Sequence, residues 1–151
     1  RTPPPPDAAA PVSQLALDTS LSDAFYQAMD NTTSGDAALF GKRLAFRIGD
    51  KTPWTLVEVD SAGGVAVTFA VADPAADARV TYRSDGVFEA LVDERYGSAV
   101  AVATGRLRVS GSVRVASASE SLFDAAEATL REKYAVGSSD AAAERRAAAL
   151  E

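Results

Sequence analysis

The chain has 151 residues and a formal net charge of −6, from 15 Lys and Arg against 21 Asp and Glu. It contains neither histidine nor cysteine, which excludes Ser-His-Asp and Cys-His catalytic groups, His-ligated zinc, disulfide bonds and iron–sulfur clusters. The acidic balance argues against general nucleic-acid binding, and the length predicts one domain. We expect no metal and no cofactor.

The two ends of the chain differ in composition from its middle. Residues 1–17 include the proline run Pro3–Pro6, which predicts an extended linker or a disordered tail. Residues 137–151 are expected to be a second tail, and 147–151 resemble a vector-encoded stretch. The folded domain is therefore expected over residues 18–136. Because the chain starts at Arg1, we also expect a fragment, a trimmed chain or a processed product.

The first half of this domain predicts one helix followed by a run of strands. Capping residues at 18–20 precede Leu21, Phe25 and Met29, which recur at helical spacing. Alternation of apolar and polar residues then predicts strands over 43–48, 54–60, 65–71 and 79–83.

The second half predicts helices on either side of one further strand. Ser84 and Asp85 cap a helix over 85–94, residues 98–104 are too short to assign, and a last helix starts near Ser119. Between them, apolar residues alternate with arginines over 105–116, which predicts a strand with Gly111 on its apolar face, where something can approach closely. Strands that follow one another in a run favour an α/β (α+β) fold with a mostly antiparallel sheet and helices on one face.

Two motifs carry a family resemblance. Residues 77–81 read Asp-Ala-Arg-Val-Thr, and residues 105–111 read Gly-Arg-Leu-Arg-Val-Ser-Gly. They resemble the Asp-x-x-hydrophobic-Thr and Gly-Lys-Leu-Lys-Ile-x-Gly patterns of the sterol carrier protein 2 family, with arginine in place of lysine. With the order of elements around them, the resemblance covers residues 20–135.

The resemblance implies a five-stranded sheet covered by helices, with an apolar tunnel that holds a fatty acid, a fatty acyl-CoA, a sterol or another lipid. An acyl chain gains ~0.8 kcal/mol for each buried methylene, so the tunnel needs apolar walls and no catalytic residue. The residues expected at this ligand site are Phe88, Leu91, Val102, Val109, Gly111, Val113, Leu122, Phe123 and Leu130. An ordinary filled core would use the same apolar residues.

Two functions therefore stay open for the domain. The first is non-enzymatic lipid binding and transfer. The second is an accessory interaction domain of a larger protein, with a closed or shallow cavity.

Seven arginines occupy outward strand positions of the predicted sheet: Arg43, Arg47, Arg79, Arg83, Arg106, Arg108 and Arg114. One interpretation is a solvated face paired with carboxylates such as Glu58 and Asp60. The other is an anion-binding surface, in which Arg106, Arg108 and Arg114 meet an anionic membrane or an adjacent domain.

Overall fold

The computed structural model describes residues 20–50 and 52–135. The predicted linker (1–17) and tail (137–151) lie outside these residues, as do the outermost positions of the predicted 18–136 domain. The elements, in chain order, are α1 (Leu21–Met29), the 3₁₀ helix η2 (Ala37–Leu39), β1 (Arg43–Ile48), β2 (Trp54–Val59), β3 (Val65–Val71), β4 (Ala78–Tyr82), α2 (Asp85–Val92), α3 (Ser98–Ala103), β5 (Leu107–Gly111), α4 (Val113–Ala118) and α5 (Glu120–Ala135).

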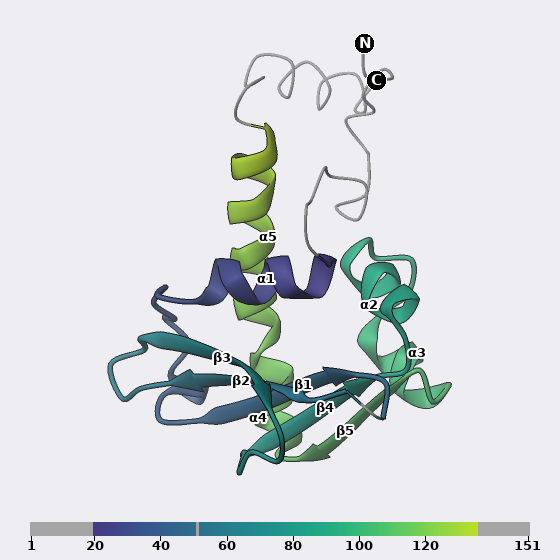
Figure 1. Cartoon of the computed structure of the whole chain (residues 1–151), viewed down its shortest axis with the longest axis horizontal. Helices are drawn as coiled ribbons and strands as arrows, with labels where there is room; N and C mark the ends of the chain where they lie inside the picture. Colours follow the sequence, from purple (N-terminus) through teal and green to yellow (C-terminus); the bar gives the residue numbers. More distant parts are fainter. Residues whose placement is uncertain (1–19, 51, 136–151) are drawn as a thin grey trace.

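The five strands form one sheet in the order β3-β2-β1-β4-β5. The pairs β1–β2, β2–β3 and β4–β5 are antiparallel, and only β1–β4 is parallel. Figure 1 shows α1, α2 and α5 on the same side of this sheet. The predicted α+β fold with a mostly antiparallel five-stranded sheet and helices on one face is thus confirmed.

The helix-facing side of the sheet, called the inner face here, meets the helices through aromatic rings. The ring of Phe123 on α5 lies 5.4 Å from that of Phe46 on β1, 6.1 Å from Phe25 on α1 and 6.0 Å from Phe88 on α2, measured between centroids. Ring pairs at these separations add to the gain from burial. This cluster fixes α1, α2 and α5 against one another and against the sheet.

The strand predicted over 105–116 is wrong beyond Gly111. Gly111 adopts a φ of +82°, and Ser112 then caps α4 by accepting a hydrogen bond from the Val115 N–H at 3.1 Å. A left-handed residue followed by a serine cap ends the strand and starts a helix. Val113 and Arg114 therefore lie on α4 and not on an alternating strand.

The hydroxyl of Tyr26 gives the first testable prediction. Tyr26 on α1 is 3% exposed, and its hydroxyl is buried without a hydrogen-bond partner among the described residues. Because an unsatisfied buried hydroxyl costs about 1–3 kcal/mol, we expect Tyr26→Phe to leave the melting temperature unchanged or to raise it. Thermal unfolding of the two proteins measures the effect. A loss of more than about 1 kcal/mol would contradict it, because the hydroxyl would then have a stabilising partner.

Candidate lipid-binding cavity

A cavity of about 750 Å³ lies between the inner face of the sheet and the helices. Its sheet side is formed by β1, β4 and β5 through Phe46, Val80, Leu107 and Val109. These residues face the same way because the strands alternate and because Phe46, Val80 and Val109 are register partners. The volume lies within the range of about 300–1,000 Å³ that is typical of small-molecule sites.

Two groups of helices form the walls of the cavity. One wall comes from α2, α3 and the loop between them, and it includes Phe88, Leu91 and Tyr96. The opposite wall comes from α4 and α5 and includes Ala116 and Phe123. The two walls are joined by a 3.2 Å hydrogen bond from the Ser98 hydroxyl on α3 to the Glu120 carboxylate on α5.

Six of the nine residues expected at the ligand site line this cavity: Phe88, Leu91, Val102, Val109, Val113 and Phe123. Val102 and Val113 are 50% and 71% exposed, so the cavity reaches the surface between α3 and α4. Val113 reaches it from the first turn of a helix, not from the predicted strand.

The other three residues do not line the cavity. Leu130 is buried in the core, and Leu122 is buried beside a second, smaller pocket. A Cβ at Gly111 would lie 2.4 Å from the Asp77 carbonyl oxygen. The close approach expected at Gly111 is therefore that of the β4 backbone.

Several lining residues were missed by the sequence analysis. Tyr82 on β4 and Phe25 on α1 both line the cavity. The alternation of β4 puts Tyr82 on the face of Val80, so its position could have been predicted. Carboxylates at the cavity edge, which the sequence analysis did not single out, come from Glu94, Glu120, Asp124 and Glu127.

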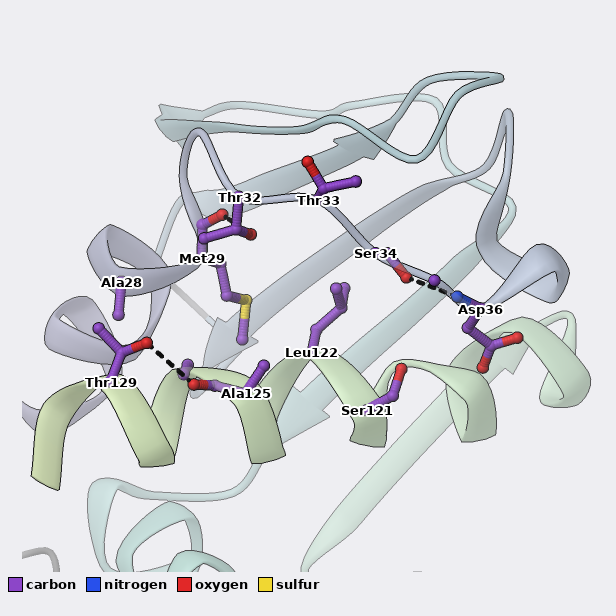
Figure 2. A pocket seen from close by; sticks show the side chains of 12 residues that line it. Ala28, Met29, Thr32, Thr33, Ser34, Asp36, Ser121, Leu122, Ala125 and Thr129 are labelled. Carbon is purple, nitrogen blue, oxygen red and sulfur yellow. Dashed lines mark hydrogen bonds between the residues drawn. The ribbon is translucent and has the colours of Figure 1, made fainter. Parts of the chain in front are cut away.

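A second pocket of about 380 Å³ lies between α5 and the segment after α1 (Figure 2). Its hydroxyl groups bond to the backbone near them: Thr32 to the Met29 carbonyl at 2.5 Å and Thr129 to the Ala125 carbonyl at 3.1 Å. Ser34 accepts a hydrogen bond from the Asp36 N–H at 3.1 Å. With these groups already satisfied and half the volume, this pocket is a weaker ligand site than the cavity.

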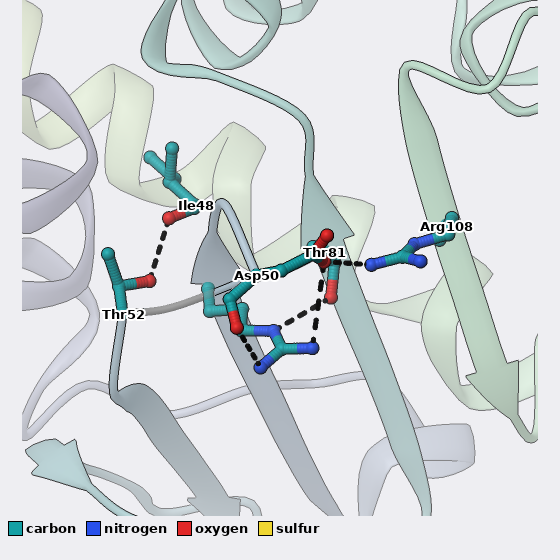
Figure 3. Close-up of polar contacts among 6 residues, drawn as sticks. Ile48, Asp50, Thr52, Thr81 and Arg108 are labelled. Carbon is teal, nitrogen blue, oxygen red and sulfur yellow. Dashed lines mark hydrogen bonds and ion pairs between the residues drawn. The ribbon is translucent and has the colours of Figure 1, made fainter.

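The outer face of the sheet carries four of the seven predicted arginines, and each is paired with a carboxylate. Arg43 pairs with Glu58 at 3.1 Å, and Arg79 with Asp73 at 3.0 Å. Arg47 and Arg108 both pair with Asp50, and Figure 3 shows Arg108 directed toward Asp50.

Trp54 adds to the packing of this face, because the Arg47 guanidinium lies 4.2 Å from its ring centroid and that of Arg79 5.3 Å away. The pairing with Glu58 agrees with the solvated-face interpretation. Asp60 is instead held in a turn, where it accepts the Ala62 and Gly64 N–H groups at 2.8 Å.

The expected basic surface of Arg106, Arg108 and Arg114 is not a single face in the structure. Arg108 lies on β5 beside Asp50, and Arg114 lies on helix α4. The Arg106 guanidinium lies 4.9 Å from the centroid of the Tyr96 ring, a cavity residue. The placement of all three arginines on one strand face is wrong, because the alternation that put Arg114 on the strand ends at Gly111.

Two further properties bear on function. Within residues 20–50 and 52–135, no group of His, Cys, Asp and Glu side chains is arranged to hold a metal ion. No helix described by the structure combines the length and the apolar character needed to cross a membrane.

Comparison with known proteins agrees with the resemblance found in the sequence. The model of the SCP-2 sterol transfer family matches residues 22–124. No curated protein matches the chain. The chain is similar to the structure of Sterol Carrier Protein 2 from Yarrowia lipolytica (apo form), with 21% identity over 75% of this chain and 97% of that chain and a TM-score of 0.50. It is also similar to the sterol carrier protein domain 2 of Helicoverpa armigera, with 17% identity over 70% and 84% of the two chains and a TM-score of 0.50.

Proposed function

Because the chain belongs to the SCP-2 sterol transfer family, we propose that it binds the apolar part of a lipid in the 750 Å³ cavity and transfers that lipid without catalysing a reaction. Family membership supports lipid binding and transfer in general. We propose in addition that the lipid occupies this particular cavity and that the protein catalyses no reaction.

The observation that carries the proposal is the apolar inner surface of an open cavity. Phe46, Val80 and Val109 from the sheet and Phe88 and Phe123 from the helices line it. An acyl chain or a ring system placed there would lose water from each methylene, worth ~0.8 kcal/mol each. A carrier needs no reacting side chain, which suits a chain without histidine or cysteine.

Val109 and Ser110 offer a matched test on the same strand. Val109 is half-buried and lines the cavity, whereas Ser110 is exposed and pairs with Arg79 on the outer face. We expect Val109→Phe to weaken lipid binding roughly tenfold, because the added ring displaces about two methylenes at ~0.8 kcal/mol each. Ser110→Phe adds the same ring outside the cavity and should leave binding unchanged. Displacement of a fluorescent fatty acid measures affinity, and thermal unfolding confirms that both variants fold.

The same measurements separate the proposal from the accessory-domain alternative. Native mass spectrometry of the freshly purified protein should show a bound lipid that Val109→Phe reduces. If both variants bind lipid like the parent protein, the ligand lies elsewhere. If neither a co-purified lipid nor probe displacement is found, the cavity is not a lipid site and the interaction-domain function stands.

A further inference from the structure

The edge of the cavity is acidic although its interior is apolar. Among the described residues, four carboxylates line it, namely Glu94, Glu120, Asp124 and Glu127, and no lysine or arginine does. Three of the four follow one side of α5 at spacings of four and three residues, which brings them onto the same helical face. A ligand held in this cavity therefore has its polar end in a negative electrostatic potential.

Only part of this negative charge is neutralised by neighbours. Glu127 pairs with Arg131 one turn further along α5, at 3.1 Å. Glu120 accepts a hydrogen bond from the Ser98 hydroxyl, which carries no charge. Neither Glu120 nor Asp124 forms an ion pair with another residue in the described ranges.

Arg106 also stands near the cavity, through its stacking on Tyr96, but it does not line the cavity. Arg131 pairs with Glu127, and Arg106 forms no ion pair with Glu120 or Asp124. The charges of Glu120 and Asp124 therefore remain available to a ligand.

Tyr82 supplies an independent indication that a polar ligand atom belongs here. It is 6% exposed, lines the cavity from β4, and packs edge-on against Phe88 with 5.1 Å between ring centroids. Its hydroxyl forms no hydrogen bond with another described residue, and it is not one of the described side-chain atoms that are closed off from solvent without a partner. Burial and then the charge of Glu120 raise the pKa of Tyr82, so the hydroxyl stays protonated and neutral. A hydroxyl at the cavity wall that has no protein partner can form a hydrogen bond with the polar atom of a ligand.

We propose that the lipid carried by this cavity has an ammonium group at its polar end, held by the carboxylates of Glu120 and Asp124 with the Tyr82 hydroxyl as a hydrogen-bond acceptor. This inference rests on the proposed function and names the class of ligand. An ammonium provides several donors to groups that accept, and the same negative potential opposes a fatty acid carboxylate or the phosphates of an acyl-CoA. The carboxylates do not form a metal-binding group, so an organic cation fits them better than a metal ion.

The test compares three probes with one apolar chain and different polar ends: dodecylamine, dodecanol and dodecanoate. Competition against a fluorescent lipid, below the micelle concentration, measures each affinity. We expect the amine to bind at least tenfold more tightly than the carboxylate, with the alcohol between them. Added salt should reduce the difference, because it screens charges at the cavity edge.

Variants on α5 assign the preference to the named residues. Glu120→Gln combined with Asp124→Asn should weaken amine binding at least tenfold and change dodecanol binding less than twofold. Glu132→Gln removes a negative charge from an exposed position of the same helix that does not line the cavity, and should leave the amine affinity unchanged. Unaltered dodecanol binding also shows that the double variant is folded.

Three results would overturn the inference. If dodecanoate binds as tightly as dodecylamine, or if the double variant binds the amine like the parent protein, the carboxylates do not select the ligand, although lipid binding itself stands. If none of the three probes binds, the proposed function fails together with the inference.

Discussion

Gly111→Ala is expected to destabilise the fold by roughly 3–4 kcal/mol. A φ of +82° is a left-handed conformation that costs a residue with a Cβ about 1–2 kcal/mol. The new Cβ would also lie 2.4 Å from the Asp77 carbonyl oxygen and 3.2 Å from the Ala78 Cα. The same carbonyl accepts the Ser112 N–H at 2.8 Å, so moving it would strain the start of α4 as well. Chemical denaturation measures the loss.

Gly105→Ala is the matched control for this prediction. Gly105 also has a positive φ, +73°, but a Cβ there would meet nothing within 4 Å. Gly105→Ala should therefore lower the free energy of unfolding only by the cost of the left-handed conformation, about 1–2 kcal/mol. Equal losses for the two variants would show that the β4 backbone yields to the added methyl group, and that the close approach at Gly111 contributes little to stability.

The comparison of strand β5 with helix α4 shows what the sequence pattern can and cannot predict. Leu107 and Val109 alternate with arginine because one side of β5 faces the helices, and that pattern predicted the strand and its inner face. The residues after it continue the alternation over Val113 and Val115, yet they form a helix. Period-two alternation over three residues is too short to separate a strand from one helical turn. The decisive signals were Gly111, which can adopt a positive φ, and the capping hydroxyl of Ser112.

The candidate site was predictable where one side of an element faces the cavity. Helical spacing placed Phe88 and Leu91 on the side of α2 that lines it. On α5 the same spacing grouped Phe123 with Leu122 and Leu130. Successive helical residues turn by about 100°, so the apolar stripe is wide enough for Phe123 to reach the cavity while Leu122 borders the smaller pocket. The direction of each side chain within the stripe depends on how α1 and α5 pack against each other. The spacing of apolar residues along the sequence does not predict that packing.

The acidic edge of the cavity could not be recognised from the sequence. Glu94 follows α2, and the other three carboxylates lie on α5, which the chain reaches only after β5. On each helix alone they resemble ordinary solvated positions. Only the three-dimensional fold brings them around one opening, beside Tyr82 from the sheet.

Phe123→Ala is expected to cost about 3 kcal/mol, at the lower end of the range for removing a buried phenylalanine. Phe123 contacts the rings of Phe25, Tyr26, Phe46 and Phe88, and those contacts would be lost. One side of its ring already borders the open cavity, so no fully enclosed void is created and the cost stays below that of a completely packed ring. The enlarged cavity should favour longer or bulkier lipids, which a series of acyl chain lengths in the displacement assay would show.

Leu130→Ala separates this effect from a simple loss of core packing. Leu130 is 3% exposed and lies on the same helix, but it does not line the cavity. Its truncation should cost about 2–5 kcal/mol and leave the chain-length preference unchanged. The tunnel assignment of Phe123 requires a shift in preference for Phe123→Ala alone. A stability loss in both variants with the same preference as the parent protein would make Phe123 ordinary core and move the lipid site away from α5.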